Sequence, residues 1–220
     1  RADAELGFFD VTTASRLAGP SLPLTGFGAV FGDFDLDGDL DLAAAHGGVT
    51  RGSRPGDGEA GTLARDYGQP TLFFEQRRGR FHPVPVEVEA DVGRALARGD
   101  LDGDGDLDLV ASHSGGPPRL YLAPGEPRRP WLQVDARRAG GGVAEHAHIA
   151  LHDGGVRQVR LVARGQSYLT SHSPIAHFGL GDGAAGRAGR VERVEVRWPG
   201  GGVTAVLDVP PNRRLRVVEP

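Results

Sequence analysis

The sequence contains no cysteine and no lysine, and these absences exclude several classes of function. Without cysteine, the chain has no disulfide framework and no thiolate for catalysis. All 25 basic residues are arginine, which together with abundant alanine, glycine and proline indicates a GC-rich bacterial coding bias. No apolar run approaches the roughly 18 residues that a membrane-spanning helix needs. Methionine is also absent, so we expect the chain to be a processed product or a fragment.

Acidic and basic residues are unevenly divided along the 220 residues. Residues 1–127 carry 11 arginines and 21 acidic residues, a net charge of −10. Residues 128–220 carry 14 arginines and 8 acidic residues, a net charge of +6. The sign changes near the proline-rich segment 124–130, whose composition is typical of a linker. We therefore predict two domains, 1–127 and 128–220.

Two copies of an aspartate-rich pattern lie 67 residues apart in the first domain. DFDLDGDLD (33–41) and DLDGDGDLD (100–108) each place five aspartates on alternate positions. Two carboxylates ~4 Å apart repel by about 4 kcal/mol at an effective dielectric of ~20, so such a cluster must be well solvated or bind a cation. The candidate ligands are Asp33, Asp35, Asp37, Asp39, Asp41, Asp100, Asp102, Asp104, Asp106 and Asp108.

The ligand type and spacing of the two loops favour calcium. Calcium takes six to eight oxygen ligands, and Gly38 and Gly105 stand at the sixth position, where glycine permits a turn. The EF-hand pattern fits only the first six positions, because position 12 is alanine in both copies. We predict two Ca²⁺ ions, bound by the side chains of positions one, three, five and nine and by the carbonyl of Asp39 or Asp106. Magnesium and soft metals fit an all-oxygen protein cage less well, and two solvated acidic turns are the alternative.

Both domains are expected to be β-structure. Short apolar segments bounded by Gly, Pro or Asp predict strands in the first domain, and alternating apolar and polar residues predict strands in the second. The alternation places Val194, Val196 and Trp198 on one buried face. Residues 49–69 are expected to form a surface loop. The predicted strands are 28–31, 40–45, 71–74, 107–112, 119–122, 131–138, 156–163, 191–198, 203–209 and 213–219.

The motifs also resemble known families. GDFDLDGDLDL (32–42) resembles the FG-GAP/VCBS repeat, the calcium-loop blade of integrin-α-type β-propellers, and GFFDVT (7–12) resembles a strand that opens such a blade. GGVRQVRLVARGQSYLTSHSPIAHFGLGD (154–182) and VERVEVRWPGGGVTAVLDVPPNRRLRVVE (191–219) resemble the ASPIC/UnbV domain, which follows such blades in bacterial homologues of cartilage acidic protein. Residues 139–153 depart from that family's usual Asn-rich entry.

The resemblance implies an all-β fold. It implies two calcium-loop propeller blades, followed by a β-sandwich or barrel-like domain. Two blades cannot close a propeller ring, so the blades are expected to be the C-terminal part of a larger propeller.

Two functional hypotheses from different classes follow. The first is a non-enzymatic, calcium-binding recognition or scaffold protein that acts at an extracellular, periplasmic or cell-surface location, with an unidentified protein or glycan partner. Sites with Kd as weak as ~10⁻⁴–10⁻³ M would suit extracellular calcium. The second, implied by the UnbV-type resemblance, is an accessory or catalytic component of an enediyne-type biosynthetic pathway. The sequence shows no catalytic constellation outside the metal loops, which favours the first.

Four further patterns carry weaker predictions. Residues 98–100 spell the adhesion tripeptide Arg-Gly-Asp, but Asp100 is needed as a calcium ligand. His146 and His148 would share a face if they lay in one strand, and His152 follows, yet no further zinc ligand is evident.

The remaining two patterns concern catalysis and nucleic acid. Ser167, His172 and Asp182 could be named as a triad, but nothing resembles a nucleophile elbow or an oxyanion loop, so no catalytic residue is predicted. The arginines of the second domain alternate with apolar residues and lack an aromatic stacking platform, so we expect no nucleic-acid partner. Their charge is instead expected to face the acidic first domain.

Overall fold

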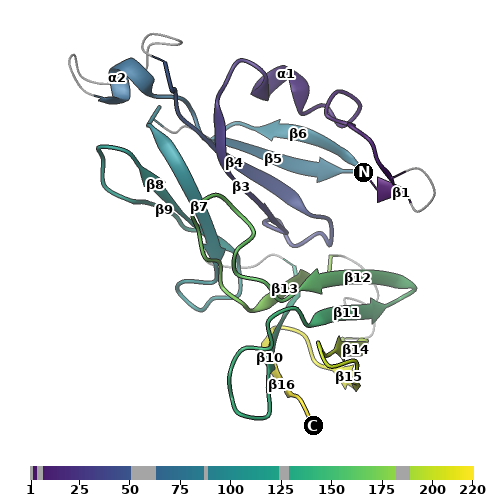
Figure 1. Ribbon diagram of the computed structural model, residues 1–220. Coiled ribbons are helices and arrows are strands. Elements are labelled where there is room, and N and C mark those ends of the chain that lie inside the picture. Colours follow the sequence, from purple (N-terminus) through teal and green to yellow (C-terminus); the bar gives the residue numbers. More distant parts are fainter. Residues whose placement is uncertain (1, 4–6, 51–62, 87–88, 124–128, 182–188) are drawn as a thin grey trace. The chain divides into compact units, whose positions relative to one another are not determined.

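The computed structural model describes residues 2–3, 7–50, 63–86, 89–123, 129–181 and 189–220. Most of the predicted surface loop, at 51–62, and most of the predicted linker, at 124–128, lie outside the described residues, as does Asp182. The all-β prediction is confirmed, since the helices α1 (Ala18–Ser21) and α2 (Leu63–Tyr67) are short and the remaining elements are strands (Figure 1).

The first region, residues 1–127, forms a four-stranded and a three-stranded sheet (Figure 1). In both sheets the strands lie in their order along the chain, β3-β4-β5-β6 and β7-β8-β9. The five strands predicted here are confirmed, while β6 and β7 were not predicted. The strands are β1 (Ala2–Asp3), β2 (Gly7–Phe8), β3 (Gly26–Gly32), β4 (Asp41–His46), β5 (Leu72–Arg77), β6 (Arg80–Val84), β7 (Gly93–Gly99), β8 (Asp108–His113) and β9 (Arg119–Tyr121).

The prediction of a blade-opening strand at 7–12 is wrong. Only Gly7–Phe8 is a strand, and it pairs with Ala2–Asp3. The Asp10 carboxylate accepts hydrogen bonds from the backbone N–H of Thr12 at 2.8 Å and from its hydroxyl at 2.6 Å. This local side-chain turn competes with strand pairing and reverses the chain.

The two sheets of the first region approach each other through β3 and β7. A Cβ atom on Gly28 would lie 2.6 Å from the backbone nitrogen of Leu96 and 3.0 Å from the carbonyl carbon of Ala95. Any side chain at this position would therefore force the two strands apart. Each of these strands is the first strand of its sheet and leads directly into an aspartate loop.

The C-terminal region is a two-sheet β-sandwich. The order β13-β10-β16 forms one sheet, in which β10 pairs antiparallel with β13 and parallel with β16. The order β12-β11-β14-β15 forms an antiparallel second sheet. The strands are β10 (Trp131–Arg137), β11 (His148–Asp153), β12 (Val156–Leu161), β13 (Ala176–Gly179), β14 (Val191–Arg197), β15 (Val203–Val209) and β16 (Arg213–Val218).

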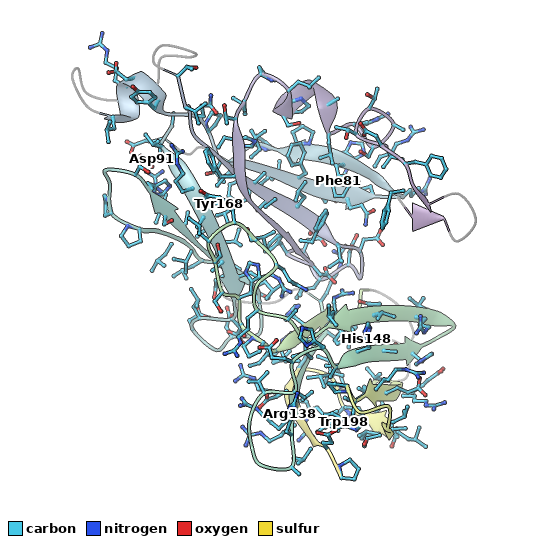
Figure 2. All side chains as sticks on the ribbon, viewed as in Figure 1. Phe81, Asp91, Arg138, His148, Tyr168 and Trp198 are labelled. Atoms are coloured by element: carbon cyan, nitrogen blue, oxygen red, sulfur yellow. The ribbon has the colours of Figure 1, made fainter. Side chains whose placement is uncertain are left out.

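Both sheets contribute one face to a single apolar core. Leu132 and Phe178 come from the first sheet and are fully buried, while Ile149 comes from the second. Val194, Val196 and Trp198 are 0%, 0% and 3% exposed, so their predicted burial is confirmed. Figure 2 labels Trp198 among the strands of this sandwich. The Trp198 indole N–H also donates to the Thr204 hydroxyl at 2.8 Å, which satisfies its polar edge.

The backbone contacts divide the chain into two compact units. One unit comprises 1–31, 40–96 and 111–119, and the other comprises 32–39, 97–110 and 120–220. Both aspartate loops thus group with the C-terminal sandwich, although they belong to the first region in sequence. The predicted domain boundary between 127 and 128 concerns independent folding and stays a prediction.

Candidate metal centres

The two aspartate loops occupy equivalent places in the fold. The first follows β3 and ends at Asp41, the first residue of β4, and the second follows β7 and ends at Asp108, the first residue of β8. Each loop therefore joins one strand to the next. Gly38 and Gly105 have φ angles of 98° and 105°, a backbone conformation that residues other than glycine rarely adopt.

In the first loop, three side chains converge at one point. One carboxylate oxygen from each of Asp33, Asp35 and Asp37 lies within 4.8 Å of the other two. The loop is closed by its own amides, since Asp35 accepts from the N–H of Asp37 at 3.1 Å and Asp37 accepts from that of Asp39 at 2.8 Å. Asp33 is completely buried and accepts from the N–H of Gly38 at 3.1 Å.

In the second loop, a different set of positions converges. Carboxylate oxygens of Asp100, Asp102 and Asp108 lie within 4.8 Å of one another. Asp100 accepts from the N–H of Gly103 at 2.7 Å, and Asp108 accepts from that of Leu101 at 2.7 Å. The first loop therefore brings together positions one, three and five, and the second brings together positions one, three and nine.

Two predicted side-chain ligands, Asp41 and Asp104, lie outside the two converged sets. Asp41, at position nine of the first loop, accepts from the backbone N–H of Gln76 at 2.8 Å. Asp104, at position five of the second loop, accepts from the N–H of Asp106 at 2.9 Å. The full predicted cage, including the carbonyls of Asp39 and Asp106, stays a prediction.

The crowding of carboxylates raises the pKa of one aspartate in each loop. Burial, followed by repulsion from Asp104 and Asp108, raises the pKa of Asp106 to about 6. Asp106 is 5% exposed, and its Oδ1 has no hydrogen-bond partner among the described residues. Burial and the neighbouring Asp37 also raise the pKa of Asp35. An all-oxygen set with unfavourable mutual repulsion fits a hard divalent cation.

The first loop rests on the C-terminal sheet. The backbone N–H of Gly179, in β13, donates to Asp33 Oδ2 at 3.0 Å. A Cβ atom on Gly179 would stand 2.3 Å from that oxygen, so glycine is required for this approach. The Arg129 guanidinium donates to the carbonyl of Asp35 at 2.9 Å and to its carboxylate at 3.2 Å.

The second loop rests on the same sheet. Gln133, in β10, donates its amide to Asp100 Oδ2 at 2.6 Å. Arg214, in β16, lies 3.7 Å from the same carboxylate oxygen. His177 Nε2 lies 2.8 Å from the carbonyl oxygen of Gly105 and so carries the proton, and burial lowers the pKa of this imidazole to about 4.

Sequence reasoning did not identify these contacts with the sheet. His177 and Gly179 belong to the HFGLG segment that carried the family resemblance, which was the one available signal. Gln133 stands on the polar face of its strand, which a sequence pattern assigns to solvent.

The adhesion tripeptide at 98–100 is built into this contact. The Asp100 side chain is 5% exposed and is bonded to Gln133. Arg98 is half-buried, and burial lowers the pKa of its guanidinium. This geometry agrees with the expectation that the tripeptide is not presented for adhesion.

The three histidines do not form the arrangement considered from the sequence. His146 lies outside β11 with a φ of 68°, so it does not share a strand face with His148. Instead, His148 and His152 share a face of β11 and pair with Arg197 and Arg193 of β14. Among the described residues, neither histidine belongs to a cluster of three metal-ligating side chains.

One member of the considered triad, Asp182, lies outside the described residues. Ser167 and His172 lie between β12 and β13. The Nδ1 atom of His172 accepts from the backbone N–H of Arg98 at 3.3 Å. Burial lowers the pKa of His172, so it is a neutral structural acceptor at neutral pH.

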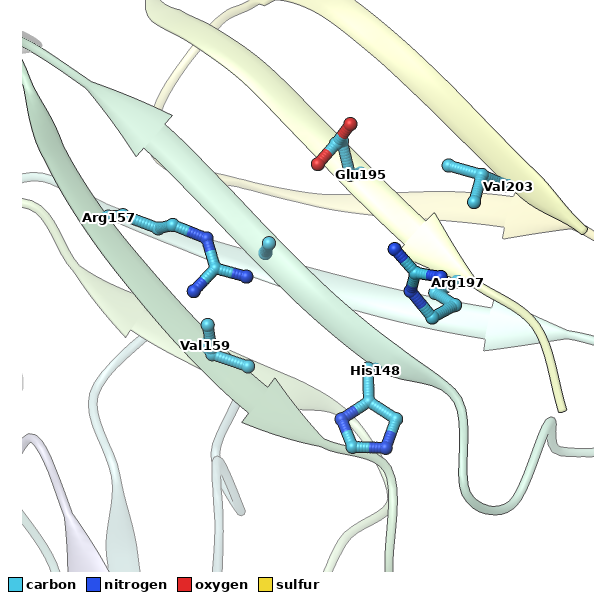
Figure 3. A pocket seen from close by; sticks show the side chains of 7 residues that line it. His148, Arg157, Val159, Glu195, Arg197 and Val203 are labelled. Carbon is cyan, nitrogen blue, oxygen red and sulfur yellow. The ribbon is translucent and has the colours of Figure 1, made fainter. Parts of the chain in front are cut away.

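A shallow hollow of about 280 Å³ lies on the solvent face of the β12-β11-β14-β15 sheet (Figure 3). Ala150 is its smallest lining residue, and His148, Glu195 and two arginines stand around it. Because adjacent strands place these residues in register, the hollow follows directly from a small side chain among large ones.

The fold and the loops define an all-β protein with two acidic loops that rest on a C-terminal sandwich. Residues 142–220 match the family model described as ASPIC and UnbV, which confirms that part of the resemblance. The chain is 34% identical over 135 residues to cartilage acidic protein 1 of Homo sapiens and of Mus musculus, and 33% identical over 141 residues to that of Xenopus tropicalis.

These alignments cover 56% of the chain for the two mammalian proteins and 59% for the amphibian protein. They cover 20% to 21% of the relatives, so the chain spans about a fifth of the length of the curated relatives it matches. In the described part of the chain, no helix is long and apolar enough to cross a membrane.

Proposed function

We propose that the chain is a non-enzymatic, calcium-binding module that acts in recognition or scaffolding outside the cytoplasm. The observation that carries the proposal is the convergence of three carboxylates, within 4.8 Å of one another, in each of two equivalent loops. When bound, calcium would neutralise the carboxylates and fix the loop between the two strands that flank it.

The arrangement of the first region supports FG-GAP/VCBS-type propeller blades. Propeller blades are four-stranded sheets packed side by side, and β3-β4-β5-β6 is such a sheet in chain order. The sheet that begins with β7 repeats the strand–loop–strand pattern and approaches the first through Gly28. On this proposal the chain contributes two blades of a larger ring.

The perturbed side chains support a structural rather than a catalytic role. The imidazole of His177 is bonded to the carbonyl of Gly105. Burial lowers the pKa of Arg160 to about 10, and its guanidinium lies 5.0 Å from the ring centre of Phe178. Both groups are committed to packing, whereas catalytic groups need access to a substrate. A role in biosynthesis stays a prediction from the resemblance.

The proposed location outside the cytoplasm rests on two considerations. Extracellular modules use calcium sites with Kd of about 10⁻⁴–10⁻³ M, a range open to small loops with few ligands. The chain also resembles proteins named for cartilage. An unidentified protein or glycan is the proposed partner.

Titration calorimetry with calcium tests the proposal. We expect two ions per chain, and we expect Asp37→Ala and Asp102→Ala each to remove one, because both side chains belong to the converged sets. Asp10→Ala is the matched control, because Asp10 holds a local turn outside both loops. Absence of a calcium heat at millimolar concentration would remove the basis of the proposal.

A further inference from the structure

We propose that the C-terminal sheet completes the second calcium loop, with Gln133 as the positioning residue for Asp100. The inference rests on the proposed function and names the residue outside the loop that orients its first ligand. Gln133 is 2% exposed and lies in the central strand of the β13-β10-β16 sheet. Its side chain therefore has few alternative conformations.

The orientation of the Gln133 amide is fixed at both ends. Its Oε1 accepts from Arg214 Nε at 2.8 Å, so its NH₂ group faces the Asp100 carboxylate at 2.6 Å. The other oxygen of Asp100 accepts from the N–H of Gly103 at 2.7 Å. The loop thus holds one oxygen of its first ligand, and the sheet holds the other.

This arrangement differs between the two loops. In the first loop, the equivalent aspartate, Asp33, accepts from the backbone N–H of Gly179, and the charge of Arg160 acts on it, whereas Gln133 donates to Asp100 of the second loop. Substitution of Gln133 therefore perturbs the second loop selectively, and the first loop serves as an internal control on the same sheet.

Partners that orient a metal ligand from outside the coordination shell change metal affinity by about 10–100-fold when they are removed. We expect Gln133→Ala to weaken calcium binding at the second loop by about this factor and to leave the first loop unchanged. Arg214→Ala should also weaken the second loop, but less, because Arg214 bonds to Gln133 and lies 3.7 Å from Asp100 while its side chain is 46% exposed. Arg213→Ala, on the neighbouring position of β16, is the matched control.

The test is an NMR titration of the whole chain with calcium. The amide of Gly38 reports the first loop and that of Gly103 reports the second, because each donates to the first aspartate of its loop. A selective loss at Gly103 supports the proposal. Unchanged affinity in both the Gln133 and Arg214 variants, or an equal loss at both loops, overturns it.

Two controls keep this test separate from the proposed function. If neither glycine amide of the unmodified chain responds to calcium, the proposed function fails before the variants are compared. If Gln133→Ala does not fold, Gln133→Asn decides the outcome, because its side chain is one methylene shorter and its amide cannot reach both Asp100 and Arg214.

An independent observation points to a second site. The geometry of the hollow on the β12-β11-β14-β15 sheet assigns it a small organic carboxylate. Figure 3 shows the guanidinium groups of Arg157 and Arg197 projecting from β12 and β14, on either side of β11. His148 stands at one end, and Ala150 leaves room between them.

Arg157 and Arg197 are available to bind an anion in the hollow. Glu195 is engaged by Arg193 and lies 3.3 Å from His152, so its charge is compensated within the sheet. Among the described residues, no ion pair joins Arg157 or Arg197 to an acidic side chain. Arginine binds carboxylates through two parallel hydrogen bonds, which suits a pair of unengaged guanidinium groups.

The hollow also has apolar walls. Val159 and Val203 line it and are 38% and 49% exposed, so they can cover the apolar part of a ligand. Its volume of about 280 Å³ is slightly below the range of about 300–1,000 Å³ that holds drug-sized ligands, so the hollow suits a small molecule. A ligand with one carboxylate and a short apolar or sugar body fits these dimensions.

Titrations with pentanoate and glucuronate, followed through the amides of His148 and Ala150, test this site. Pentanamide is the neutral control of the same shape. We expect saturable shifts with at least one carboxylate, and we expect Arg157→Gln and Arg197→Gln each to weaken binding by about tenfold, the loss of one charge-assisted hydrogen bond.

A response to pentanoate alone indicates a free apolar acid, and a response to glucuronate alone indicates a sugar acid. Either result supports the site. Absence of saturable shifts with both carboxylates, an equal response to pentanamide, or unchanged binding in both arginine variants overturns it.

Discussion

Replacement of Gly105 by alanine tests how closely the second loop fits the C-terminal sheet. Gly105 has a φ of 105°, and a Cβ atom there would lie 2.0 Å from the indole ring of Trp131. Gly103, two residues earlier, has a φ of 85°, but a Cβ atom there would meet no other atom within 4 Å. The two substitutions therefore share backbone strain and differ in the steric clash.

The expected losses of stability follow from these two contributions. Placing a residue with a Cβ in a left-handed conformation costs about 1–2 kcal/mol, and this is the expected cost of Gly103→Ala. Overpacking against a fixed neighbour adds about 1–3 kcal/mol. Gly105→Ala should therefore lower the free energy of unfolding by about 2–5 kcal/mol.

Urea unfolding of the two variants, with and without calcium, measures the difference. We expect Gly105→Ala to be less stable than Gly103→Ala by at least about 1 kcal/mol, the lower limit of the packing cost. Equal losses would mean that the half-buried indole of Trp131 moves aside freely. In that case the loop would not be packed against the sheet as described.

Three further predictions concern the loops and the sandwich. Asp102→Ala should lower the free energy of unfolding in calcium but not without it, because Asp102 belongs to the converged set and an ion that binds the folded chain at 100 times its Kd stabilises it by about 2.7 kcal/mol. Equal losses in both conditions would contradict this. In the folded chain, burial lowers the pKa of His177 to about 4. Between about pH 6.5 and pH 4 this imidazole is therefore protonated in the unfolded chain but not in the folded one. The free energy of unfolding should fall by up to about 3 kcal/mol as the pH drops through this range. His177→Gln should remove this contribution to the pH dependence of the free energy of unfolding. Because Asp106 contributes with the opposite sign in both proteins, the difference between them isolates His177. An unchanged pH dependence in the variant would refute the role given to His177. Phe178→Ala should cost about 3–5 kcal/mol by calorimetry, and a loss under 1 kcal/mol would show that the sandwich core is not closed around it.

The strand pattern was predictable wherever one face of a strand is apolar. Val194, Val196 and Trp198 alternate with charged residues, so their burial followed from the period of two. The aspartate loops were equally predictable, because five carboxylates on alternate positions have few other uses. Short strands such as β13, with only four residues, carry too little pattern to be assigned from the sequence.

The contact between the loops and the sheet was not predictable from periodicity. Gln133 and Asp135 alternate with buried apolar residues in β10, which predicts a solvent-exposed polar face. Both are nevertheless buried, at 2% and 3% exposure. A polar face can be buried when other residues supply its hydrogen bonds. For Gln133 the partner is Asp100, which lies more than 30 residues away in the sequence. Local patterns do not contain this information.

The central claim is that each loop binds one calcium ion. Metal analysis of the chain after equilibrium dialysis against millimolar calcium measures this directly. We predict two ions per chain, one after Asp33→Asn or Asp100→Asn alone, and none when both substitutions are combined. A calcium content in the unmodified chain no greater than that of the double variant would contradict the account.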